Sequence, residues 1–289
     1  KALLFLGAGS VIMGMHHDQD MRNMGGLWKY MPITWITSLV GSLALIGFPF
    51  LSGFYSKDSI IEAVHASHLP GAGYALFCVM SGVFVTAFYS FRMYFLVFHG
   101  KERFGQSDHH HHGDHKDEEP SDDHHHGLAP GQKPHESPWV VTVPLILLAI
   151  PSVIIGFLTI DPMLFGDWFK GVIHINSEAH PAMEELAHEF HGAIAMAIHG
   201  FTTVPFFLAM SGVVIAWFFY LVRPDIPAAI QKLFSPIYSL LENKYFFDKF
   251  NEVFFAGGSK LIGTGLWKAG DVGIIDGVAV NGSARLVGW

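Results

Sequence analysis

Long apolar stretches separated by polar links run along most of the chain, and this pattern predicts helices that cross a membrane. A membrane-spanning helix needs about 20 mainly apolar residues. The apolar stretches cover residues 2–15, 33–50, 74–98, 138–160 and 203–222. The first is too short to cross alone and is expected to be the second half of a span. Each of the other four is expected to cross.

The remaining segments differ from one another in character. Residues 101–137 form a charged, His-rich loop, and residues 161–200 form a link of mixed polarity. In the segment 230–255, aromatic and aliphatic residues recur every three to four positions between charges, which predicts an amphipathic helix on a membrane surface. From Gly257 onward the chain is rich in glycine, which lowers helix propensity by about 1 kcal/mol per residue relative to alanine.

Composition and charge narrow the class of protein. Hydrophobic residues make up 51% of the chain and charged residues only 15%, against about a quarter charged in a soluble domain. The formal net charge of −8 argues against a nucleic-acid partner, which would need a basic face. The single cysteine excludes an internal disulfide and a Cys-ligated iron–sulfur cluster. We therefore predict an all-α, multi-pass membrane protein.

The ends and the basic residues suggest context and orientation. The chain begins and ends inside apolar patterns, so we expect an internal piece of a longer polypeptide. Basic residues gather in the links that follow 74–98 and 203–222. The positive-inside rule makes the side of those two links cytoplasmic and places the 161–200 link on the opposite side.

Residues 48–63, FPFLSGFYSKDSIIEA, put a lysine and an aspartate after a helix-breaking segment. The simplest interpretation is a discontinuous helix, with a break around Pro49–Gly53 and then a helix that contains Lys57 and Asp58. Irregular backbone survives at membrane depth only where it is buried in protein or lines a wet cavity, and such breaks commonly mark transport sites. A buried lysine can release and regain a proton, which an arginine cannot.

A plainer interpretation of the same stretch is an interfacial pair whose side chains extend to lipid headgroups, and the residues alone leave both open. Lys1 presents a similar choice. It directly precedes an apolar run, so it is either an intramembrane functional residue or a basic anchor beside a span.

Three other polar groups invite a functional interpretation but favour a plainer one. The stretch 108–126 combines imidazoles with carboxylates, which bind divalent metals, yet its irregular spacing is typical of a solvated linker. Glu185 and His188 have the spacing of a helical metal-ligand pair, but a solvated helix explains them. Arg92 lies close enough to a span end for snorkelling to explain it.

Taken together, three segments resemble the antiporter-like, L-type subunits of bacterial respiratory complex I, the proton-translocating NADH:quinone oxidoreductase. They are residues 1–65, with LIGFPFLSGFYSKDSIIE the most specific run, FYSFRMYFLVFHGKER (88–103) and NKYFFDKFNEVFF (243–255). The resemblance implies the second half of a transmembrane bundle over residues 1–100 with a broken helix at about 50–67. It further implies spans within 138–222 and a long lateral amphipathic helix over 223–289.

The same resemblance implies roles and partners. Lys57 would be the broken-helix lysine at the end of a proton path, Asp58 its acidic neighbour and Lys1 the preceding relay lysine. NAD, FMN, iron–sulfur clusters and quinone would belong to other subunits, with no cofactor or metal in this chain. Its partners would be other membrane subunits and lipid in a bacterial inner membrane. Two alternatives remain: the large subunit of a multisubunit cation/proton antiporter, and a divalent-metal transporter with a His-rich loop.

Overall fold

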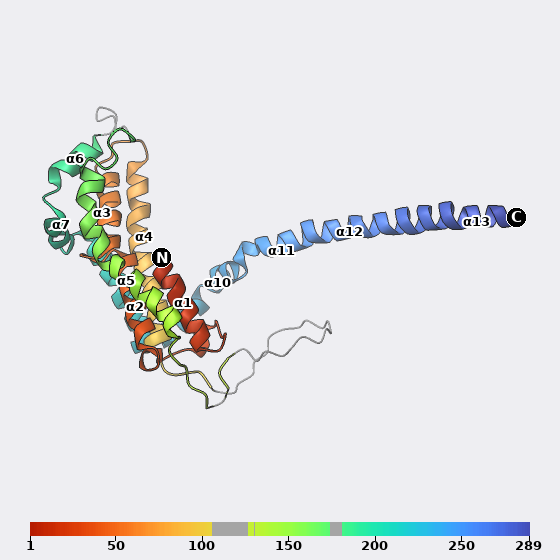
Figure 1. The fold of residues 1–289 in the computed structure, drawn as a ribbon, viewed down its shortest axis with the longest axis horizontal. Helices are drawn as coiled ribbons and strands as arrows, with labels where there is room; N and C mark the ends of the chain where they lie inside the picture. Colours follow the sequence, from red (N-terminus) through yellow and green to blue (C-terminus); the bar gives the residue numbers. More distant parts are fainter. Residues whose placement is uncertain (106–126, 130, 174–180) are drawn as a thin grey trace. The chain divides into compact units, whose positions relative to one another are not determined.

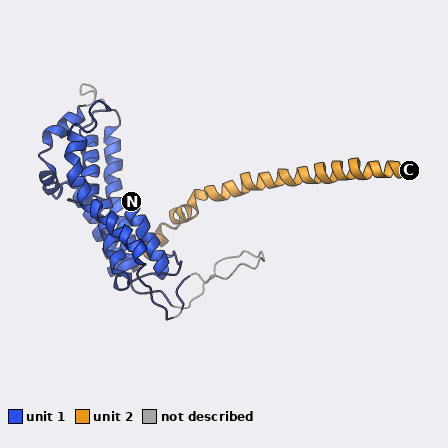
Figure 2. Cartoon of the chain, viewed as in Figure 1, with its two compact units in different colours: residues 1–224 blue, residues 225–289 orange. Residues whose placement is uncertain are grey.

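The computed structural model describes residues 1–105, 127–129, 131–173 and 181–289, and every regular element among them is helical. The His-rich stretch 108–126 lies outside the described residues. The chain divides into two compact units, Lys1–Pro224 and Asp225–Trp289 (Figure 2). The prediction of an all-α membrane protein is confirmed by three helices that are long and apolar enough to cross a membrane, Ala72–His99, Trp139–Phe165 and Val204–Val222.

Unit 1 is a bundle of helices (Figure 1). Its α-helices are α1 (Ala2–Gly14), α2 (Pro32–Ile46), α3 (Ser52–His65), α4 (Ala72–Tyr94), α5 (Trp139–Ile160), α6 (Ala182–Glu189), α7 (Ala193–Gly200) and α8 (Val204–Trp217). Helices α4, α5 and α8 each continue by one π-helical turn, to His99, Phe165 and Val222. The spans predicted at 74–98, 138–160 and 203–222 therefore form as single helical segments.

The span predicted at 33–50 is different, because α2 ends at Ile46. Helices α2 and α3 have 15 and 14 residues. At a rise of 1.5 Å per residue each is only about 21–23 Å long, shorter than the ~30 Å hydrocarbon core. Figure 1 shows them end to end, and α5 packs against both. The two helices are thus halves of one interrupted span, with the break near its middle.

Polar links hold one end of the bundle together. The segment between α1 and α2 passes so close to the end of α4 that a Cβ on Gly25 would lie 1.9 Å from the Lys101 carbonyl oxygen. Arg103 donates hydrogen bonds to the Arg22 and Met21 carbonyl oxygens at 2.7 and 3.1 Å. Lys29 forms an ion pair with Glu102 at 3.0 Å. The two links therefore lie at the same end of unit 1.

Glu136, which precedes α5, completes the N-terminus of α2. Its carboxylate accepts hydrogen bonds from the backbone N–H groups of Ile33 and Thr34 at 2.8 and 3.3 Å, and from the Thr34 hydroxyl at 2.6 Å. The first N–H groups of a helix have no partner within the helix. The Thr34 hydroxyl also lies 2.7 Å from that of Ser10, which donates to Ser137 at 2.7 Å. Buried hydroxyls thus connect α1, α2 and the start of α5.

Helix α8 packs closely along α4. A Cβ on Gly212 would lie 2.7 Å from the Phe84 carbonyl oxygen, so the two backbones approach as only glycine allows. Arg92 donates to the Tyr220 hydroxyl at 3.0 Å, and its guanidinium lies 5.3 Å from the centre of the same ring. Arg92, which the sequence explains by snorkelling, therefore also has a partner on α8 near the end of that span.

Unit 2 is helical throughout most of its length. It contains α9 (Asp225–Leu233), α10 (Ser235–Glu242), α11 (Phe247–Asn251), α12 (Gly257–Leu266) and α13 (Asn281–Gly288), with π-helical segments at Glu252–Ala256 and Trp267–Val280. At Lys244–Phe246 three successive φ angles are positive, 50°, 56° and 60°, which interrupts the helix. The low helix propensity of the glycine-rich part does not prevent helix formation. The long helix that the resemblance implies forms there.

Candidate functional site

The chain leaves α2 through a glycine-capped turn. Gly47 has φ 77° and ψ 45°, the left-handed conformation that glycine adopts without steric cost. Its N–H donates to the Ala44 carbonyl oxygen at 3.2 Å, and that of Phe48 donates to Leu43 at 3.0 Å. This pair of bonds is the Schellman motif, which ends helices. Pro49 follows, and the helical conformation does not resume until Ser52.

Helix α3 starts in close contact with its neighbours. A Cβ on Gly53 would lie 1.8 Å from the Ala44 carbonyl oxygen, and one on Gly156 would lie 2.6 Å from the Cα of Ser52. The expected break at Pro49–Gly53 therefore lies a few residues earlier, at 47–51. Gly53 belongs to the first turn of α3, where its missing side chain lets α3 approach the end of α2.

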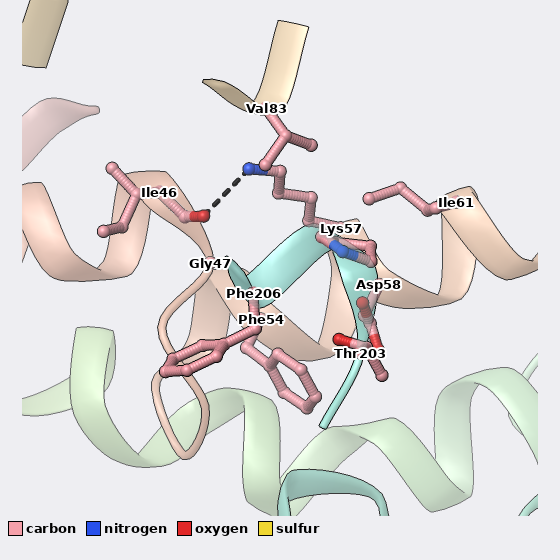
Figure 3. Close-up of a pocket in the computed structure, with 10 residues that line it drawn as sticks. Ile46, Gly47, Phe54, Lys57, Asp58, Ile61, Val83, Thr203 and Phe206 are labelled. Atoms are coloured by element: carbon pink, nitrogen blue, oxygen red, sulfur yellow. Dashed lines mark hydrogen bonds between the residues drawn. The ribbon is translucent and has the colours of Figure 1, made fainter. Parts of the chain in front are cut away.

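Lys57 turns back from α3 to the end of α2. Its Nζ donates to the Ile46 carbonyl oxygen at 2.8 Å (Figure 3). The last carbonyl groups of a helix lack partners within the helix and bear partial negative charge, so they favour a cation. The side chain is half-buried. The break thus supplies Lys57 with an acceptor that an uninterrupted helix would have used internally.

Asp58 is buried beside Lys57 and is 5% exposed. Figure 3 shows the two side chains leaving α3 in different directions. Both line a cavity of about 10 Å³, together with Gly47 and Thr203. A volume of about 10–15 Å³ is the least that holds one water molecule. The lysine and the aspartate therefore border a common space of water size at the break.

A second interruption faces the first. Helix α7 ends at Gly200 and α8 begins at Val204, so the described chain has non-helical backbone at 201–203. The Phe201 ring lies 5.8 Å from that of Phe48 and 6.2 Å from that of Phe50, both of which belong to the first break. A Cβ on Gly200 would lie 2.5 Å from the Phe54 ring. The two breaks therefore pack against one another. This second break is not among the predictions from the sequence, although the glycine and proline of HGFTTVP (199–205) are the signal for it.

The antiparallel register of α1 and α2 locates Lys1. Ser10 pairs with Thr34, a Cβ on Gly7 would lie 2.9 Å from the Ser38 hydroxyl, and Leu4 packs at Gly41. Continuing this register puts Lys1 opposite the last turn of α2, whose final carbonyl binds Lys57. Lys1 itself is exposed at the N-terminus of α1. Its proposed role as a relay therefore remains a prediction.

The other polar groups singled out in the sequence stay apart from this site. Glu185 and His188 are both exposed on α6. Within the described ranges, no three His, Cys, Asp or Glu side chains come together as a possible metal site. The 108–126 stretch, with its imidazoles and carboxylates, is outside those ranges.

Comparison with known proteins gives consistent matches. Residues 1–87 match the family model for the transmembrane region of NADH:quinone oxidoreductase and Mrp antiporter proteins. The chain is 58% identical over 288 residues to "NADH-quinone oxidoreductase subunit L" of Neisseria meningitidis serogroup A, a match that covers all of this chain and 42% of the relative. The protein of the same name from Rhodobacter capsulatus is 35% identical over 350 residues, covering all of this chain and 45% of that protein.

A third relative has a related name. "NAD(P)H-quinone oxidoreductase chain 5" of Picosynechococcus is 37% identical over 310 residues, covering all of this chain and 41% of that protein. The chain therefore spans less than half the length of these curated relatives.

Proposed function

We propose that this chain, a member of the L-type subunit family of NADH-quinone oxidoreductases, moves protons across a bacterial inner membrane by way of Lys57. The observation that supports this most directly is the position of the Lys57 amine. It binds the terminal carbonyl of α2 at 2.8 Å, beside a water-sized cavity that Asp58 also lines. A lysine in this position has one partner for its protonated form and a neighbouring carboxylate that can take the proton.

The proposed relay has three protein positions. Lys1 passes a proton toward Lys57, since the register of α1 and α2 puts it opposite the last turn of α2. Lys57 holds the proton as an ammonium group at the Ile46 carbonyl. Asp58 then accepts the proton, and Lys57 becomes neutral and ready for the next one. Water in the cavity between them is the bridge that a transfer of this kind needs.

The membrane potential sets the work that this relay must do. Moving one charge across 100 mV costs about 2.3 kcal/mol. The potential therefore favours return of the proton, and net transport requires that Asp58 does not give the proton back to Lys57. In the parent complex, electron transfer from NADH to quinone would supply this work. NAD, FMN, iron–sulfur clusters and quinone would bind in other subunits, so this chain would serve the translocase without a redox centre of its own.

The direct test compares Lys57→Met with the wild-type full-length protein in the assembled complex. NADH-driven proton uptake by inverted membrane vesicles is measured and divided by the rate of NADH oxidation. The matched control is Lys29→Met, because Lys29 is an exposed lysine of a polar link, paired with Glu102. We expect Lys57→Met to lower the proton-to-electron ratio and Lys29→Met to leave it unchanged. An unchanged ratio in an assembled Lys57→Met complex would reject the proposal.

The partners of unit 2 form a second part of the proposal. Large apolar side chains are exposed along it, among them Leu261, Ile262, Leu266, Trp267, Ile274 and Ile275. An amphipathic helix gains most of its stability by packing its apolar face, so we propose that unit 2 lies against neighbouring membrane subunits and lipid. Replacing Leu266 with glutamate should reduce the yield of assembled complex, whereas the same change at the neighbouring polar position Thr264 should have little effect.

The name of the matching family model also includes antiporters, so cation/proton exchange is the second candidate function. It would use the same Lys57 site with a cation gradient in place of electron transfer. Proton movement that depends on sodium and proceeds without NADH would favour this candidate. The names of the relatives described above favour the oxidoreductase.

A further inference from the structure

A second cavity lies next to the Lys57 site, between α3, α6 and α7. Its volume is about 470 Å³, and its lining includes Glu62, Glu189, His191 and His199. A water molecule occupies about 30 Å³ in the liquid, so the cavity has room for many. Two of these residues, Glu62 and His199, belong to helices that pack at the two breaks, where ionisable groups are costly and mark ion pathways.

Helix α3 connects this cavity to the proposed relay. Asp58 and Glu62 are four residues apart, so they lie on the same face of the helix about one turn from each other. Asp58 borders the small cavity at the break, and Glu62 borders the larger one. The half-buried Glu62 therefore lies between the buried Asp58 and the open space.

The second interrupted helix supplies the other side of the connection. His199 is in the last turn of α7, directly before the break at 201–203, and it lines the larger cavity. The His199 ring interacts electrostatically with Asp58. Glu62 interacts in the same way with Asp58 and with Glu189. Glu62 of α3 and His199 of α7 are thus both near enough to Asp58 to interact with it.

We infer that Glu62 and His199 continue the proton path from Asp58 into the 470 Å³ cavity, so that the proton leaves at the side of the 161–200 link. This inference rests on the proposed function of Lys57. In each step one proton moves: protonated Asp58 gives it to the Glu62 carboxylate or the His199 ring, and that group gives it to water in the cavity. Glu189 and His191, which also line this cavity, are exposed.

Charge-removing variants test this path in the assembled complex with the full-length chain. Glu62→Gln and His199→Gln are combined, and the proton-to-electron ratio is measured as for Lys57→Met. The matched control is Glu185→Gln with His188→Gln, the same residue types on the exposed surface of α6 and outside the cavity lining. We expect the ratio of the Glu62/His199 variant to fall to that of Lys57→Met, and the control to keep the wild-type ratio. A second double variant, Glu62→Asp with His199→Gln, retains a carboxyl group at position 62. Its proton-to-electron ratio should lie above that of the Glu62→Gln and His199→Gln variant.

The outcomes separate this inference from the proposed function. A wild-type ratio in the Glu62/His199 variant, together with a lowered ratio in Lys57→Met, overturns the path and leaves the function of Lys57 intact. Wild-type ratios in both variants overturn the proposed function itself. A loss of ratio that Glu62→Asp does not relieve at all would assign Glu62 a structural role and overturn the path.

A second measurement holds even where the Glu62 variant does not assemble. Ala195 lines the same cavity, so Ala195→Cys is introduced after Cys78, the one cysteine of these 289 residues, has been replaced by serine. A charged thiol reagent that cannot cross the membrane should label position 195 from the side of the 161–200 link. Labelling only from the side of the 101–137 link, or from neither side, overturns an exit through this cavity.

Discussion

The Lys57 amine and the Ile46 carbonyl oxygen, 2.8 Å apart, join the two halves of an interrupted helix across the break between them. The bond is possible because α2 ends at Gly47, which frees the carbonyl groups of its last turn. A lysine at this position is therefore both a structural contact and an ionisable group. Its loss of a proton would weaken the contact between α2 and α3.

Lys57→Arg separates the charge of this side chain from its ability to titrate. Arginine keeps the positive charge and the hydrogen-bond donors, but it does not lose its proton in proteins. We expect the complex to assemble and to oxidise NADH, with a proton-to-electron ratio as low as that of Lys57→Met. If the arginine variant pumps normally, a fixed charge is sufficient at this position and a proton relay through it is ruled out.

Gly53→Ala should disrupt the packing of α3 on α2. The added Cβ would lie 1.8 Å from the Ala44 carbonyl oxygen, which is a backbone atom and cannot rotate away. Overpacking of this kind typically costs about 1–3 kcal/mol, so we expect less assembled complex and a lower melting temperature in detergent. Gly82→Ala in α4 is the matched control, because a Cβ there meets nothing within 4 Å. Equal stability of the two variants would contradict the close approach at Gly53.

Glu136→Ala should destabilise the N-terminus of α2. The substitution removes the acceptor of two backbone N–H groups and one hydroxyl, and loss of a helix cap usually costs about 0.5–2 kcal/mol. Glu136→Gln, which keeps one carbonyl oxygen, should cost less. Thermal unfolding of the purified complex is the measurement, and an order of stability with alanine above glutamine would argue against capping by Glu136.

The Asp20 carboxylate offers a prediction about pH. Its hydrogen bond with the Arg22 guanidinium lowers the pKa of Asp20 below its ordinary value. A carboxyl group whose pKa is lower in the folded state stabilises that state above its unfolded pKa of about 4, and this contribution disappears as the pH falls through the folded pKa. The pair is largely exposed, so its contribution should be below about 1 kcal/mol.

The destabilisation caused by Asp20→Asn should therefore be small and the same at pH 6 and pH 8, as measured by thermal unfolding. An effect that grows between these two pH values would show that another group titrates at this link.

The ionisable residues of the candidate site are easier to recognise in the sequence than the position of the helix break beside them. Lys57 and Asp58 stand out because charges are rare among apolar stretches, whatever the local geometry. The break was placed at Pro49–Gly53, since a glycine that ends a helix and a glycine that lets two helices approach look alike in sequence. Gly47 does the first and Gly53 does the second, and only the positive φ and the contact with Ala44 distinguish them.

Most features that the sequence did not predict depend on contacts between segments that are far apart in the chain. Glu136 caps a helix that begins more than a hundred residues before it, and no local pattern indicates such a partner. His199 falls inside the predicted 161–200 link, because α7 has only eight residues and is too short to be recognised as part of a span. Glu62 could have been found, since its spacing from Asp58 places both carboxylates on one helix face.

The contact between the two breaks also has an evolutionary consequence. Gly200 has no side chain and the Phe54 ring occupies the space that one would need, since a Cβ at position 200 would lie 2.5 Å from that ring. In an alignment of relatives, a larger residue at position 200 should therefore occur together with a smaller one at position 54. This pairwise exchange would leave a record of the packing between the two breaks that can be read without any structure.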